Sequence, residues 1–175
     1  MQLIPPTTTT GQYRALGLVC GTLTPSSSYA SATLTTPDGR VYPATPGRFE
    51  LLAKFQACVE SGQTYWFYVH PQPRGTRMGL GIIKIMSTAD AEPEEGFLVA
   101  PEDAEATFNI RGTISPQGDS IDVTVERKPH DGKHFPPLVI PLQGFLPGAA
   151  EGEFWDLWAE LEGDDLILVD GSRVE

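Results

Sequence analysis

The chain has 175 residues, a mass of 19.0 kDa and 40% hydrophobic residues, which suits one ordinary domain or two small ones with a core. Glycine (18 residues) and proline (16 residues) make up about a fifth of the chain, below the level typical of disordered sequences. No apolar run approaches the length of a bilayer span, and the first residues lack the basic and apolar regions of a signal peptide. We therefore expect a cytoplasmic protein with no membrane partner.

The net charge of −11 is unevenly distributed along the chain. Residues 1–88 hold seven basic and three acidic side chains, a net +4, whereas residues 89–175 hold five basic and twenty acidic ones, a net −15. Because a partner responds to the local potential, the first half should attract acidic partners and the second half basic ones. Cys20 and Cys58 lack metal-ligand spacing, so we expect two buried thiols, although the sequence does not exclude a disulfide between them.

Alternation of apolar and polar residues predicts strands along most of the chain. The longest such stretch is 49–59, where Phe49, Leu51, Phe55 and Val59 all occupy odd positions, and a period of two is typical of a strand with one buried face. Turn residues follow, and an aromatic strand then completes a hairpin. The predicted strands are residues 14–23, 29–35, 40–44, 49–59, 64–70, 80–86, 107–114, 121–125, 138–145, 154–161 and 166–169.

This pattern divides the chain into four segments. We expect a flexible lead at residues 1–12, a basic β-barrel unit at 13–86, an acidic linker at 87–106 and an acidic β-barrel unit at 107–175. The two units share short motifs in the same order. The sequence GTLTP from Gly21 aligns with GTISP from Gly112, and Tyr65-Trp66 aligns with Phe154-Trp155, with offsets of 91 and 89 residues. The matches predict a duplication.

Each half therefore has a glycine-containing first strand, two further strands, a loop and a closing hairpin. This succession resembles a tandem of OB (oligonucleotide/oligosaccharide-binding) barrels and covers residues 13–86 and 107–170. The resemblance implies an all-β fold of two small closed barrels. Members of the family often have a helix between the third and fourth strands, and the pattern indicates none in either half. Tandem SH3-like barrels or a single β-sandwich are the alternative architectures.

No catalytic motif is present in the sequence. His130 and His134 are four residues apart, a spacing that could hold a metal ion on a helix. Pro129, Gly132 and the two prolines after Phe135 exclude a helix there. We therefore expect no metal site, no cofactor and no enzymatic activity.

The first unit combines aromatic and cationic side chains. We expect Tyr65, Phe67 and Val69 to face the core. The intervening residues, Trp66, Tyr68 and His70, then point outward, unless these three cover a second layer. Aromatic faces beside cations are typical of proteins that bind single-stranded nucleic acids. The expected binding surface comprises Arg40, Arg48, Lys54, Trp66, Tyr68, His70, Arg74 and Arg77.

The second unit carries tryptophans among carboxylates, a combination that suits a basic protein partner. The expected acidic docking surface comprises Glu153, Asp156, Trp158, Glu160 and Glu162. We expect a non-enzymatic adaptor that acts within a macromolecular complex through protein–protein contacts. The alternative is binding of RNA or single-stranded DNA by the basic first unit, and a third arrangement has the acidic half masking the basic one. The sequence leaves homo-oligomerisation open.

Overall fold

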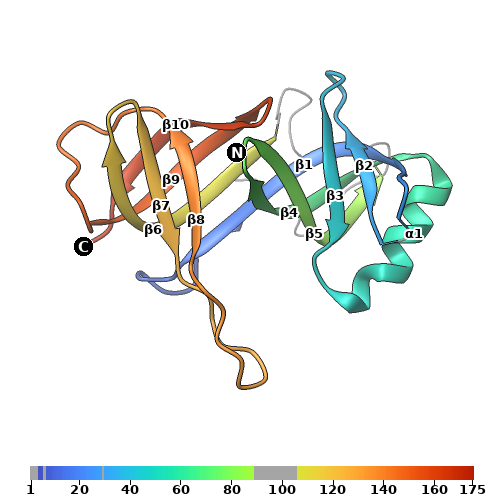
Figure 1. Ribbon diagram of the computed structural model, residues 1–175, viewed down its shortest axis with the longest axis horizontal. Coiled ribbons are helices and arrows are strands. Elements are labelled where there is room, and N and C mark those ends of the chain that lie inside the picture. Colours follow the sequence, from blue (N-terminus) through green and yellow to red (C-terminus); the bar gives the residue numbers. More distant parts are fainter. Residues whose placement is uncertain (1–3, 6, 29, 89–105) are drawn as a thin grey trace. The chain divides into compact units, whose positions relative to one another are not determined.

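The computed structural model describes residues 4–5, 7–28, 30–88 and 106–175, which belong to two compact units (Figure 1). Unit 1 comprises Met1–Ile4 and Leu16–Ala106, and unit 2 comprises Pro5–Ala15 and Thr107–Glu175. Most of the predicted acidic linker, 87–106, lies outside the described residues. None of the described helices combines the length and the apolar character needed to span a membrane.

The described residues of unit 1 form a closed barrel of strands with one α-helix. Its elements are β1 (Arg14–Pro25), β2 (Ala32–Thr35), β3 (Val41–Pro46), a 3₁₀ turn η1 (Phe49–Leu51), α1 (Leu52–Ser61), β4 (Thr64–Arg74) and β5 (Arg77–Thr88). β1 pairs antiparallel with both β2 and β4, the pairs β2–β3 and β4–β5 are also antiparallel, and β3 runs parallel to β5. The ring is therefore β1-β2-β3-β5-β4-β1, and α1 connects β3 to β4.

Unit 2 repeats this strand order without the helix. Its strands are β6 (Thr107–Gln117), β7 (Ser120–Val125), β8 (Leu138–Gln143), β9 (Phe154–Glu162) and β10 (Asp165–Arg173). β6 pairs with both β7 and β9, β8 runs parallel to β10, and the ring is β6-β7-β8-β10-β9-β6. The loop of residues 144–153 takes the place that α1 has in unit 1.

A glycine marks the point where the first strand of each barrel changes neighbour. Thr22 pairs with β4 on one side and with β2 on the other, and Thr113 does the same with β9 and β7. The preceding residues are Gly21 and Gly112. A Cβ atom at Gly21 would lie 2.8 Å from the Thr35 carbonyl oxygen, and one at Gly112 would collide with the Thr124 carbonyl. Only glycine lets the adjacent backbone come this close.

The predicted strand at 49–59 is wrong, because η1 and α1 occupy this segment. Phe55 and Cys58 are its buried residues, at a helical spacing of three, whereas Phe49 is 85% exposed. The apolar residues of this segment fit both the period of two of a strand and the spacing of a helix, so the alternation concealed the helix. Gly62, with φ of 62°, ends α1 in the left-handed conformation. The helix that the OB resemblance implied is therefore present in unit 1.

The predicted end of the next strand is also wrong, because β4 continues through Pro71 and Pro73 to Arg74. β1 pairs with β4 only as far as Val69. Beyond this residue, β4 needs no hydrogen bonds on the β1 side, so residues without an N–H group are tolerated there.

A matched pair of substitutions tests the helix in unit 1. We expect Phe55→Ala to lower the free energy of unfolding by about 3 kcal/mol or more, because it empties a fully buried position. Phe49→Ala should change it by less than about 0.5 kcal/mol, because the Phe49 ring is solvated. Urea denaturation followed by circular dichroism measures both. Equal losses would indicate the shared buried face of a strand and contradict the helix.

Candidate nucleic-acid interface

The aromatic part of β4 lies mostly inside unit 1. Phe67 and Val69 are fully buried, which confirms their predicted place in the core. Tyr68 is only 8% exposed, so its predicted outward position is wrong. The cause is two register shifts between β4 and β5, at Trp66/Phe67 and at Tyr68/Val69, which interrupt the simple alternation of faces. Trp66 is half-buried and lies opposite Cys20 of β1.

Beyond these shifts, β4 presents a polar row on its outer face, formed by His70, Gln72 and Arg74. His70 pairs with Gly81 of β5, and Gln72 pairs with Gly79. A Cβ atom at Gly81 would collide with the His70 imidazole and lie 2.6 Å from Nε2 of Gln72. The missing side chain at Gly81 therefore makes room for the two polar groups to lie flat on β5.

Gln72 connects this row to its neighbours. Its Oε1 accepts a hydrogen bond from the Arg74 guanidinium at 3.2 Å and a longer one from the Thr45 hydroxyl of β3 at 3.5 Å. Its Nε2 lies 3.5 Å from Nε2 of His70. Arg48 reaches the same stretch of β5, where it donates to the Ile83 carbonyl oxygen at 2.6 Å. We call this outer surface of β3, β5 and β4 the glycine-floored face.

Two arginines stand opposite each other at the end of this face. Arg74 and Arg77 are paired residues of the β4–β5 hairpin, separated by Gly75 and Thr76. Both are exposed, and no carboxylate among the described residues forms an ion pair with either. Like charges directly opposite each other destabilise a hairpin. The arrangement therefore favours an anionic partner.

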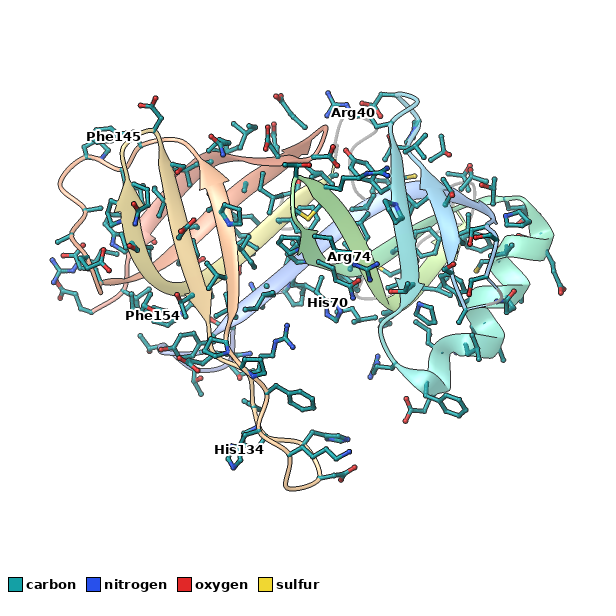
Figure 2. The ribbon with its side chains drawn as sticks, viewed as in Figure 1. Arg40, His70, Arg74, His134, Phe145 and Phe154 are labelled. Carbon is teal, nitrogen blue, oxygen red and sulfur yellow. The ribbon has the colours of Figure 1, made fainter. Side chains whose placement is uncertain are left out.

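The structure brings together only some of the predicted binding residues. Arg48, His70, Arg74 and Arg77 belong to the glycine-floored face. Arg40 lies on the β2–β3 turn, where it forms a 3.1 Å ion pair with Asp38, and Figure 2 shows it well apart from His70 and Arg74. A hydrogen bond from Thr36 and the charge of Arg40 lower the pKa of Asp38. Lys54 is exposed on α1.

Gln72, Thr45 and Gly81 complete the face, and none of them was predicted. The sequence does contain a sign of Gln72, because polar residues continue to alternate at His70, Gln72 and Arg74. The two intervening prolines concealed that the strand continues through this stretch.

In unit 2, part of the predicted acidic docking surface has internal partners. Asp156 forms an ion pair with Arg111, the residue directly opposite on β6, and its Oδ1 accepts a 2.6 Å hydrogen bond from Asn109. Arg111 is 5% exposed and Asn109 is fully buried. Trp158 is half-buried on the same strand, and Glu160 and Glu162 are exposed.

Glu153 is also engaged within unit 2. Its Oε2 accepts hydrogen bonds of 3.0 Å from the Ala150 N–H and from the Trp155 indole, and Oε1 lies 3.2 Å from Arg173. These contacts, led by the Ala150 bond, lower the pKa of Glu153. The stability that they contribute is therefore lost only as the pH falls through this lowered pKa.

The beginning of the chain, expected as a flexible lead, is in part packed in unit 2. The carbonyl oxygens of Thr10 and Gln12 accept hydrogen bonds from Arg111. Arg14 donates to Oδ1 of Asn109 at 2.8 Å. The Tyr13 ring lies edge-on to Phe154, with 5.0 Å between the ring centroids. This segment explains why polar residues on the outer side of β6 are buried.

An open cleft of about 610 Å³ lies beside this segment, lined by Arg111, Arg173, Val174, Glu175 and the threonines at 7–10. Both of its arginines already have carboxylate partners, Asp156 and Glu153. The cleft therefore offers little uncompensated positive charge to an anion. Among the residues that the structure describes, no three metal-ligating side chains gather in one place.

Comparisons with known proteins agree with this fold. Residues 110–175, all in unit 2, match a family described as a cyanobacterial OB-fold-like RNA-binding domain, C-terminal. The structure is similar to that of a deletion variant of the single-stranded DNA binding protein from Thermus aquaticus, with a TM-score of 0.51 and 13% identity over 94% of this chain and 96% of that chain. No curated protein matches the chain. The prediction of an all-β, OB-like fold is confirmed.

The Arg111–Asp156 pair gives a stability prediction. We expect Asp156→Asn to lower the free energy of unfolding of unit 2 by about 2 kcal/mol or more, because it leaves a buried guanidinium without its counter-charge. Glu160→Gln, an exposed change on the same strand, should alter it by less than about 0.5 kcal/mol. Urea denaturation followed by tryptophan fluorescence measures both. Equal effects would show that the pair contributes nothing specific.

Proposed function

We propose that the protein binds single-stranded nucleic acid, RNA or DNA, through the glycine-floored face of unit 1, and that it catalyses no reaction on it. In OB barrels, the loop between the fourth and fifth strands is one of the elements that contact oligonucleotides. In unit 1 this loop is the β4–β5 hairpin that carries Arg74 and Arg77. The family matched by unit 2 is described as RNA-binding, and the similar solved structure is a single-stranded DNA binding protein.

The observation that carries the proposal is the opposed pair Arg74 and Arg77. Their mutual repulsion is a cost to the hairpin that no described carboxylate offsets. A phosphate group bound between the two guanidinium groups would offset it, because arginine forms charge-assisted hydrogen bonds with phosphate oxygens. We therefore expect the β4–β5 hairpin to be more stable with a phosphate group bound than without one.

The neighbouring polar row supplies contacts of a different kind. The His70 imidazole can stack on an unpaired base, and the Gln72 amide can both donate and accept hydrogen bonds. Both side chains lie on the outer face next to Arg74. A strand that passes along β4 would therefore place its phosphates at the hairpin and its bases over His70 and Gln72.

The adaptor role expected from the acidic half has less support. Of its five predicted docking residues, Asp156 and Glu153 are engaged inside unit 2. The comparisons concern a family and a protein whose descriptions name RNA and single-stranded DNA, respectively. Nucleic-acid binding is therefore the function that we propose.

Charge reversal on the hairpin tests the proposal. We expect Arg77→Glu to weaken binding of oligo(U) and oligo(dT), because it removes a phosphate contact and adds a repelling charge. The same variant should unfold at equal or slightly higher urea concentration, because the introduced carboxylate would pair with Arg74. Fluorescence anisotropy of labelled oligonucleotides and urea denaturation give the two readouts.

Arg40→Gln serves as the comparison variant, since Arg40 is already paired with Asp38 on another turn. It should weaken binding less than Arg77→Gln does. For the wild-type chain, the logarithm of the binding constant should fall linearly with the logarithm of the salt concentration, and each lost phosphate contact should reduce the slope by about 0.7 for single strands. Absence of binding by the wild-type chain at low salt would refute the proposal.

A further inference from the structure

The connection between β7 and β8 in unit 2 forms a protruding hairpin that departs from its acidic surroundings. We call residues 126–137 the β7–β8 finger. All of them are exposed, and Figure 2 shows the segment around His134 projecting away from the two strands. From the distribution of charge and the local geometry, we infer that this finger is a second contact site for the phosphate backbone of a single strand. The inference rests on the function proposed above.

The tip of the finger has a defined backbone conformation. His130 and Lys133 form a β-bridge, in which the His130 N–H donates to the Lys133 carbonyl at 3.1 Å and the Lys133 N–H donates to the His130 carbonyl at 2.9 Å. Asp131 and Gly132 between them have φ values of 51° and 72°. Two successive positive φ values are typical of a tight two-residue hairpin turn. The bridge and the turn therefore define the backbone at the tip of the finger, from His130 to Lys133.

The finger concentrates the positive charge of unit 2. Unit 2 has six basic and thirteen acidic side chains, and the finger holds three of the basic ones but only two of the acidic ones. Those three cations are Arg127, Lys128 and Lys133.

The other basic residues of unit 2 have internal partners. Arg111 and Arg173 are paired with carboxylates, and Arg14 is bonded to Asn109. Within the described part of the chain, no ion pair joins a carboxylate to a cation of the finger. The finger is therefore where unit 2 can meet a polyanion.

Two exposed apolar side chains belong to the finger and to the strand that follows it. Phe135 is 43% exposed, and Val139, the second residue of β8, is 49% exposed. Thr124 of β7 lies directly opposite Val139. The outer face of the second and third strands is the surface on which OB barrels bind oligonucleotides. A base could stack on Phe135 while its phosphates contact Arg127, Lys128 or Lys133.

The two units therefore offer cations on different hairpins. In unit 1 they flank the β4–β5 turn, as Arg74 and Arg77. The corresponding β9–β10 turn of unit 2 carries Glu162, Asp164 and Asp165, which would repel phosphates. In unit 2 the positive charge lies on the β7–β8 finger instead.

Neutralising the finger in the full chain tests the inference. We expect the triple variant Arg127→Gln, Lys128→Gln and Lys133→Gln to bind both oligo(U) and oligo(dT) more weakly, and by the same factor for each, as loss of phosphate contacts requires. Its salt-dependence slope should be smaller by about 2, from about 0.7 for each contact to a single strand. Its unfolding midpoint should not change, since all three side chains are exposed.

Removal of a negative charge gives the matched control. Glu126→Gln, at the base of the finger, should strengthen binding, whereas Glu151→Gln, an exposed change in the 144–153 loop, should have a smaller effect. Equal effects of these two variants would indicate a response to net charge alone and overturn the inference. If the wild-type chain binds and the triple variant keeps its affinity and slope, the finger has no role, but the proposed function stands. If the wild-type chain binds neither oligonucleotide, both proposals fail.

Discussion

The first strand of each barrel must hydrogen-bond to two neighbours, and the remainder of the unit depends on this closure. β1 bridges β4 and β2, and β6 bridges β9 and β7, with the change of partner at Thr22 and Thr113. The strand can bend there only because Gly21 and Gly112 leave space for the carbonyl of the neighbouring strand. Once the ring closes, no sheet edge is left open, and the hairpins of each barrel are held by a fixed frame.

Part of this frame could be predicted from local patterns. Alternation identified the core residues Phe67 and Val69. The repeated Gly-Thr motif predicted only a duplication, and the structure places it at the closing point of both barrels. The alignment of Tyr65-Trp66 with Phe154-Trp155 is wrong by one residue. Gly21 lies opposite Tyr65 and Gly112 lies opposite Trp155, so Tyr65 corresponds to Trp155. Strand pairing is set by contacts distant in sequence, so alternation within one strand does not determine it.

Three features could not be predicted from the local sequence pattern, each for a different reason. The residues from Phe49 to Val59 satisfy both a period of two and a helical stripe, and only burial of Phe55 in unit 1 decides between them. Tyr68 is buried because register shifts between β4 and β5 break the alternation. The cations of the finger do not stand out in a net charge summed over residues 89–175, because the many carboxylates of that half bring the sum to −15.

The position of the acidic residues in unit 2 explains how an acidic unit could assist in binding a polyanion. Asn109 and Arg111 lie on the outer side of β6 and are buried. Thr10, Gln12 and Arg14 contact them there, and Asp156 balances the charge of the buried guanidinium. The outer side of β6 next to β9 is thus occupied by the chain itself. The carboxylates of the β9–β10 turn repel phosphates at one end of the barrel strands. The outer residues of β7 and β8 are exposed or half-buried. In the binding mode that we propose, the finger extends this surface with positive charge.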